Sequence, residues 1–280
     1  MCPHRNKITA TRPYRHNDLW RPYRPALTMA ELLITIAVMS IIAVSLATMA
    51  TAVRTGTEYS EGYQSATRYA QVALNRIRYH CTNATASEDF PGFYVFSETV
   101  GSYSFPDTLV VWYPTGGPTN SDGPPLYHEL IIYCPDPSQP NQLVEITVPD
   151  DTRTTPALSQ TATWLNELSA IKTSDAATKV VLLESLRTAS PGSSNANRGL
   201  LRFAHRVLPS LADVAAFRGG SGSWNSLAWV QDIHGTQSGL RQSWCRIELQ
   251  MAAEDPDSGI GDGATVPFFG SAALYYELTQ

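Results

Sequence analysis

The chain has 280 residues, of which 43% are hydrophobic and only 16% are charged, and its formal net charge is −5. This apolar content, with 13 Tyr, 8 Phe and 6 Trp, excludes an intrinsically disordered chain. A mean hydropathy of −0.17 excludes a protein built mostly of membrane spans, and a pI near 5.7 disfavours a nucleic-acid binder that acts through bulk charge.

Residues 1–26 are a basic segment with six cations and one acid, Asp18. The segment has neither an apolar run nor a helical period, so we do not expect it to fold alone.

A span of 22 uncharged residues follows, from Leu32 to Val53. As a helix it would be about 33 Å long, enough to cross the hydrocarbon core of a bilayer. Its Ser and Thr hydroxyls can bond backward to helix carbonyls. The excess of cations before the span places the N-terminus in the cytoplasm and the rest of the chain outside. A buried core helix and a secretory signal cut after Ala52 are the alternatives, but this run is long for either.

Glu31 stands at the start of the apolar stretch, where an ionised carboxylate needs a partner. The surrounding residues, Ala-Leu-Thr-Met-Ala-Glu-Leu-Leu from Ala26 to Leu33, resemble the processing site of type IV prepilins and pseudopilins. That site has a small residue, then Phe-Thr-Leu-Ile/Val-Glu, then an apolar helix. Thr28, Glu31, Leu32 and Leu33 match it. Four positions depart from it: Ala26 replaces the usual Gly, Leu27 replaces Phe, Met29 replaces Leu and Ala30 replaces Ile or Val. An uncleaved signal anchor with an incidental Glu remains the alternative.

The resemblance implies that prepilin peptidase cuts between Ala26 and Leu27 and that Leu27 is then N-methylated. It also implies that Glu31, with Thr28 beside it, acts in assembly by pairing with the α-amino group of an adjacent subunit. It divides the chain into a leader (1–26), a transmembrane part of the N-terminal helix (27–54), an amphipathic part of that helix (55–81) and a pilin-like head (82–280).

Beyond Arg54 the apolar residues become periodic, which predicts an amphipathic continuation of the helix to Cys81. The expected packing stripe, against the head or neighbouring helices, includes Tyr59, Tyr63, Ala66, Ala70 and Ile77.

In the head, short apolar runs separated by turn-rich stretches predict hairpins of an antiparallel sheet. The expected strands are 93–97, 108–113, 126–134, 143–148, 245–251 and 272–278. Helical patterns cover 161–171 and 176–189, and a further apolar stretch, 200–217, is broken near Pro209. The predicted fold class is α+β: a long N-terminal helix packed on an antiparallel head with extra helices.

Three cysteines, Cys81, Cys134 and Cys245, would lie outside the cytoplasm, where disulfides form. Two of them can pair, or all three can be buried thiols; the sequence leaves both open.

The sequence contains none of the common enzyme motifs, so we expect no catalysis and no required cofactor. One acidic, glycine-rich loop offers a weak calcium site, with a solvated loop as its alternative. Its carboxylates are Glu254, Asp255, Asp257 and Asp262.

The expected function is that of a structural subunit of a type IV pilus or type II secretion filament. The resemblance in size and helix content is to the J-type minor pseudopilins. The expected partners are prepilin peptidase, other pilins or pseudopilins and inner-membrane lipid, with no nucleic acid. The expected location is the inner membrane, as a single-pass protein with its head outside. The rivals are a signal-anchored ligand-binding domain that does not assemble, and a secreted enzyme freed after Ala52.

Overall fold

The structure is a computed structural model that describes residues 27–121, 123–190, 197–252 and 265–280. The chain divides into two compact units, Met1–Thr55 and Gly56–Gln280. The second unit therefore contains the amphipathic part of the N-terminal helix together with the head, and the two units are described separately below.

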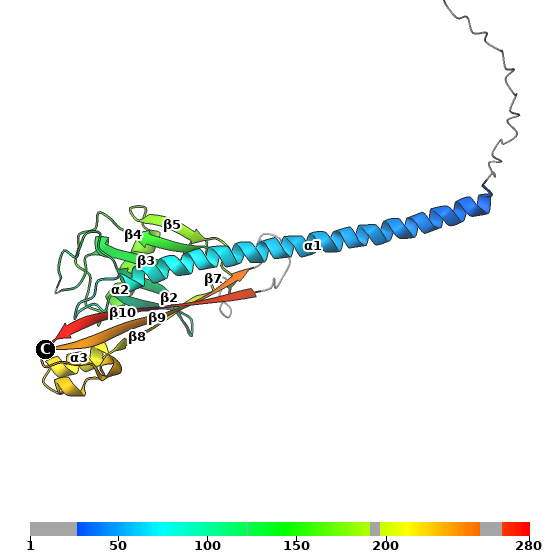
Figure 1. The fold of residues 1–280 in the computed structure, drawn as a ribbon. Coiled ribbons are helices and arrows are strands. Elements are labelled where there is room, and N and C mark those ends of the chain that lie inside the picture. Colours follow the sequence, from blue (N-terminus) through cyan, green and yellow to red (C-terminus); the bar gives the residue numbers. More distant parts are fainter. Residues whose placement is uncertain (1–26, 122, 191–196, 253–264) are drawn as a thin grey trace, which may run out of the picture. The chain divides into compact units, whose positions relative to one another are not determined.

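The first element is α1, a helix of 54 residues from Met29 to Thr82 (Figure 1). The helix begins two residues later and ends one residue later than the apolar pattern predicts. Within the first unit it is apolar and exposed, and within the second it has a row of buried residues.

A five-stranded antiparallel sheet has the strand order β1-β2-β3-β4-β5. Its strands are β1 (Phe93–Val100), β2 (Tyr103–Trp112), β3 (Leu130–Pro135), β4 (Leu143–Thr147) and β5 (Thr178–Leu183). The register places Val110 beside Ile132 and Ile132 beside Ile146. Rows of β-branched side chains therefore cross the sheet, which is the pairing that stabilises antiparallel strands.

A second antiparallel sheet has the order β10-β9-β8. Its strands are β8 (Leu201–Leu208), β9 (Ser238–Ala252) and β10 (Thr265–Thr279), and a short pair is formed by β6 (Thr188–Ala189) and β7 (Arg198–Gly199). β9 and β10 pair along all 15 residues of each strand. Burial alternates strictly along the inner part of β9, so one face of this sheet points into the core and the other points outward.

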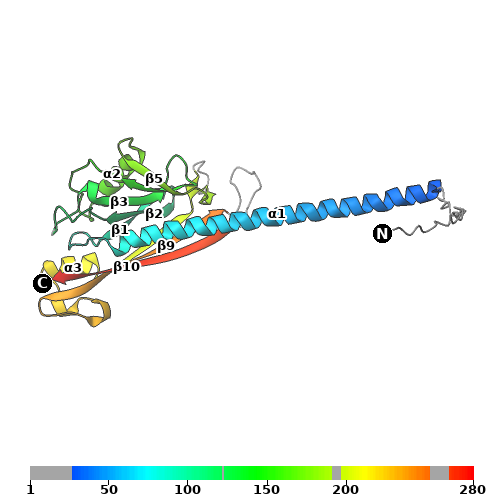
Figure 2. The same cartoon turned by 45° about the horizontal axis from the view of Figure 1, so that its top comes forward.

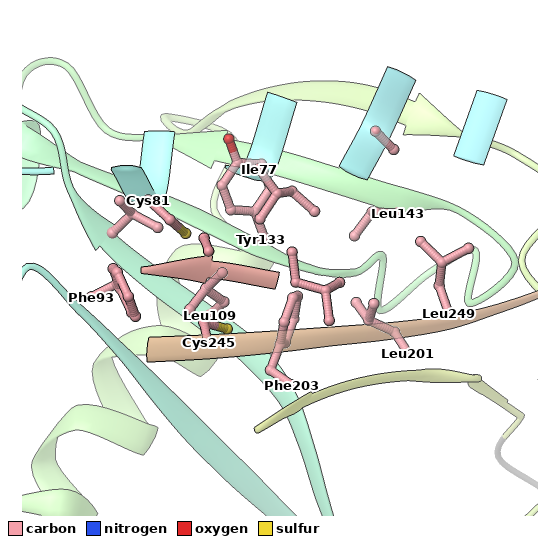
Figure 3. Close-up of a cluster of buried hydrophobic side chains, with 14 of the residues drawn as sticks. Ile77, Cys81, Phe93, Leu109, Tyr133, Leu143, Leu201, Phe203, Cys245 and Leu249 are labelled. Carbon is pink, nitrogen blue, oxygen red and sulfur yellow. The ribbon is translucent and has the colours of Figure 1, made fainter. Parts of the chain in front are cut away.

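The C-terminal part of α1 lies between the two sheets (Figure 2). A single cluster joins Ile77 and Cys81 of α1 to Leu109 of β2 and to Phe203 and Cys245 of the second sheet (Figure 3). Helix α2 (Thr161–Thr173) covers the opposite face of the five-stranded sheet. A small third cluster surrounds α3 (Leu211–Arg218) and the single-turn helices η2 (Trp224–Ser226) and η3 (Val230–Asp232).

The predicted α+β class, the long helix and the antiparallel strands are confirmed. The helix predicted over 176–189 is wrong, because this segment forms β5 and β6. β5 pairs with β4 at the edge of its sheet and exposes Val180 and Val181. Their β-branched side chains favour the strand that this neighbour makes available.

The strand predicted over 126–134 begins only at Leu130, after the turn η1 (Tyr127–Glu129). Glu129 is buried there and accepts hydrogen bonds from Trp112 Nε1 at 2.9 Å and from the amide of Thr119 at 2.6 Å. The turn is needed for these bonds, because it directs the carboxylate of Glu129 inward, toward Trp112 and Thr119, just before β3 begins.

Candidate assembly helix and its contact with the head

The start of α1 brings Thr28 and Glu31 together. Glu31 Oε2 accepts hydrogen bonds from the amide and from Oγ1 of Thr28, both at 2.9 Å, and the amide of Glu31 donates to Thr28 Oγ1 at 3.3 Å. This reciprocal arrangement is a capping box, which satisfies free donors at a helix N-terminus. The side chain of Leu27 is exposed, and Ala26 lies outside the described residues.

The first part of α1 is long and apolar enough to cross a membrane, and none of its most apolar window is buried within the protein. The predicted backward hydrogen bonds are present. Thr35, Ser40, Ser45, Thr48 and Thr51 each donate to a helix carbonyl three or four residues earlier. Their hydroxyls therefore need no water or partner chain, which suits a helix in a medium without hydrogen-bonding groups.

The stripe that contacts the head begins at Ala66. Ala66, Ala70 and Ile77 are buried, with exposures of 3%, 0% and 0%. Tyr59 and Tyr63 continue the stripe toward the N-terminus but remain 44% and 45% exposed. The two tyrosines therefore do not pack on the head, and their packing against neighbouring helices, the other contact that the stripe predicts, stays a prediction.

A polar cluster fastens the same helix to the five-stranded sheet. Arg76 donates from Nε and a terminal nitrogen to the two carboxylate oxygens of Glu145, at 2.5 and 2.7 Å. The hydroxyl of Tyr133 donates to Glu145 Oε2 at 3.0 Å, and Nδ1 of His80 contacts that hydroxyl. This cluster connects α1 to β3 and β4 through a bidentate ion pair, whose planar geometry also fixes the helix in register.

Burial and charge act on the groups of this cluster in opposite directions. Burial raises the pKa of Glu145, but the hydrogen bonds from Arg76 and Tyr133 outweigh it and hold that pKa below its usual value. Burial lowers the pKa of His80 in spite of the nearby carboxylate of Glu145. At neutral pH the cluster therefore holds one carboxylate, one guanidinium and a neutral histidine.

Sequence reasoning missed this cluster. The available signal was Glu145, a carboxylate in the middle of an otherwise apolar strand run, because buried carboxylates are rare unless they are paired. The sequence alone does not show which cation pairs with it, since Arg76 lies 69 positions away along the chain.

The cysteines are all free and buried. Cys81 and Cys245 belong to the cluster around α1 (Figure 3). Cys134 belongs to the cluster under α2, on the opposite face of the five-stranded sheet. The structure holds all three as thiols, and it places only Cys81 and Cys245 in one cluster, so a disulfide between these two stays a prediction. Burial raises the pKa of Cys134 and Cys245 to about 12, so both are uncharged thiols that pack as small apolar groups.

A second buried ionic cluster lies on the α2 side of the sheet. Lys172 donates to Glu98 and, at 2.7 Å, to Thr108 Oγ1. Arg198 donates to Glu98 at 2.9 Å and to Asp107 at 3.1 Å. The charges of this cluster thus satisfy one another around a pocket of 170 Å³, an arrangement that ties α2 and β7 to β1 and β2.

Within the described ranges, no group of three or more His, Cys, Asp or Glu side chains is placed to hold a metal ion. The proposed calcium loop, Glu254 to Asp262, lies outside the described residues.

Comparisons of the chain with protein-family models, with curated proteins and with solved structures found no match.

Proposed function

We propose that this protein is a membrane-anchored, pilin-like assembly subunit. The first part of α1 spans the inner membrane, the basic leader lies in the cytoplasm, and the head lies outside. Prepilin peptidase cuts the chain between Ala26 and Leu27, and the exposed helix then packs with other pilins or pseudopilins. The proposed type is that of the minor pseudopilins, because the head carries the helices α2 and α3 in addition to its sheets.

The continuity of α1 is the observation that carries this proposal. One helix begins with the Thr28–Glu31 capping box, continues as an uncovered apolar segment and ends as the buried partner of two sheets. A secretory signal cut after Ala52 would discard both the capping box and the uncovered apolar segment, whereas an assembly subunit uses both. A plain anchor needs no capped glutamate directly after a basic leader.

Mass spectrometry of the N-terminus of the mature protein, recovered from the membranes and from the extracytoplasmic fluid of the native host, tests the proposal. We expect a chain that begins with N-methylated Leu27. A chain that begins at Val53 indicates a secreted protein, and an intact leader indicates a signal anchor; either result contradicts the proposal.

A further inference from the structure

The outer face of the β8-β9-β10 sheet carries a group of arginine and aromatic side chains. The inner face of this sheet packs on α1, and the two faces of the five-stranded sheet are covered by α1 and α2. In the described part of the chain, no helix packs on the outer face of the three-stranded sheet. Its side chains come from alternate residues of β9 and from their partners in β8 and β10.

The composition of this face differs from that of an ordinary solvated sheet. Six side chains lie on it in adjacent cross-strand rows, and we call them the Arg–aromatic face: Arg202, Arg206, Trp244, Arg246, Phe269 and Tyr275. Arg206 lies opposite Trp244, and Arg202 and Phe269 lie on either side of Glu248. Phe269 is 62% exposed and Tyr275 is 51% exposed, so two large rings point into solvent.

The three arginines are exposed and close together. Same-face neighbours on one strand are about 7 Å apart and adjacent strands about 5 Å, so the guanidinium groups leave the sheet within about 15 Å of one another. Arg202 and Arg206 form no ion pair within the described residues, and Arg246 only approaches Glu248 at 3.9 Å. Two carboxylates, Glu248 and Glu277, lie on the same face, so the three arginines leave it a net charge of about one positive unit on an otherwise acidic chain.

The positive charge of the Arg–aromatic face contrasts with the rest of the chain, which is acidic. After cleavage at Ala26 the chain keeps 14 cations and 24 acids. Such a molecule offers no extended basic surface to the phosphate backbone of a nucleic acid, whereas carboxylates interspersed with apolar side chains can match the arginines and rings of this face locally. Arg, Trp and Tyr are also the residues that dominate the binding energy of protein interfaces.

We propose that the Arg–aromatic face docks an acidic surface of a neighbouring protein subunit. The arginines pair with carboxylates of that surface, and Phe269, Tyr275 and Trp244 bury their rings against its apolar side chains. A groove of 540 Å³ borders the face, where Arg202, Glu248 and Gln250 meet Ser104 and Phe105 of β2, and it extends the surface toward the five-stranded sheet. The inference rests on the proposed function in one respect, which is that the neighbour is another subunit of the same assembly.

Binding of a defined acidic polypeptide to the full chain in non-ionic detergent tests the proposal. The probe is a fluorescent copolymer of glutamate and tyrosine, measured by anisotropy, with an oligothymidylate of similar charge as the competing polyanion. We expect the copolymer to bind and its affinity to fall as salt is raised, because exposed charge pairs are screened. The combined variant Arg202→Gln, Arg206→Gln, Arg246→Gln should lose about tenfold or more in affinity, and Phe269→Ser a severalfold amount.

The matched control removes three exposed cations elsewhere in the same unit: Arg68→Gln, Arg78→Gln and Lys179→Gln. It should bind the copolymer as the unchanged chain does. Equal loss in both triple variants, or no binding of the copolymer at all, overturns the proposal. Tighter binding of the oligothymidylate through the same three arginines also overturns it and assigns the face to nucleic acid. The mass of the N-terminus is independent of these variants, so failure here is distinguishable from failure of the proposed function.

Discussion

His205 shows how a buried polar residue in this head makes the stability of the fold depend on pH. It lies on β8 between the rings of Phe93 and Tyr94, at 5.4 and 5.3 Å between centroids, and contacts Ser243 Oγ at 2.9 Å. Burial, helped by the charge of Arg241, lowers the pKa of His205 to about 4. The folded head therefore keeps this histidine neutral at a pH where an unfolded chain, with a histidine pKa of about 6.5, takes up a proton.

Acidification should consequently weaken the head before its carboxylates titrate. Because the pKa is lowered by folding, the contribution of His205 to the free energy of unfolding is complete above about pH 6.5 and is lost as the pH falls toward 4. The loss should reach about 3 kcal/mol in urea unfolding of the full chain in detergent, followed by near-ultraviolet circular dichroism. In His205→Gln, which keeps a hydrogen-bonding group toward Ser243, the part of this pH dependence that His205 supplies should disappear, and the part from His80, whose pKa burial also lowers, should remain.

The exposed His234 supplies the control for this measurement. His234→Gln should leave the pH dependence unchanged. If both variants behave like the original chain between pH 6.5 and 4, the burial of His205 does not control acid stability.

At the scale of elements, the two halves of the predicted stripe on α1 differ in what they contact. Ile77 is fully buried between the sheets, whereas Tyr63 lies on the same side of the helix and is 45% exposed. Ile77→Ala should therefore lower the free energy of unfolding of the head by about 3 kcal/mol, through lost burial and the cavity left behind. Tyr63→Ala should change it by less than about 1 kcal/mol.

Urea unfolding of the full chain in detergent measures both values, and Val72→Ala, at an exposed site of α1, is the control. A large loss of stability in Tyr63→Ala would show that the head contacts the helix nearer its N-terminus. A loss below about 1 kcal/mol in Ile77→Ala would contradict the packing of α1 between the sheets.

How far the sequence predicts such elements depends on whether the signal is local. The apolar run and the period of three to four residues specify α1 to within two residues, because both features act along one helix. Segment 178–183 has a pattern compatible with a helix, and only pairing with β4 makes it a strand. The same holds for the candidate site. Thr28 and Glu31 are three residues apart and are found from the sequence, whereas Arg76 and Glu145 meet only through the fold.

At the scale of the whole molecule, the net charge of −5 combines two opposite contributions. The leader holds six of the 20 cations and only one of the 25 acids, so the chain after Ala26 is strongly acidic. Subunits of this charge repel one another, and an assembly of them needs local contacts that overcome the repulsion. In the proposed assembly the apolar surface of α1 would supply one such contact, and the Arg–aromatic face would supply a second of complementary charge.

Glu31 is where assembly can be separated from membrane insertion. Within the described residues its carboxylate bonds to Thr28, and in the proposed assembly it would accept the amino group of a neighbour, an ion pair that is stronger in hydrocarbon than in water. Glu31→Ala removes the side chain that completes the capping box and leaves the 22-residue apolar run intact. We expect this variant to insert into the membrane normally but to be absent from the filament fraction after shearing and sedimentation.

Glu61→Ala, on the exposed surface of the same helix, is the control and should assemble like the original chain. Normal recovery of Glu31→Ala in that fraction would remove the assembly role of Glu31, and loss of both variants would show that the effect is not specific to the membrane-proximal carboxylate.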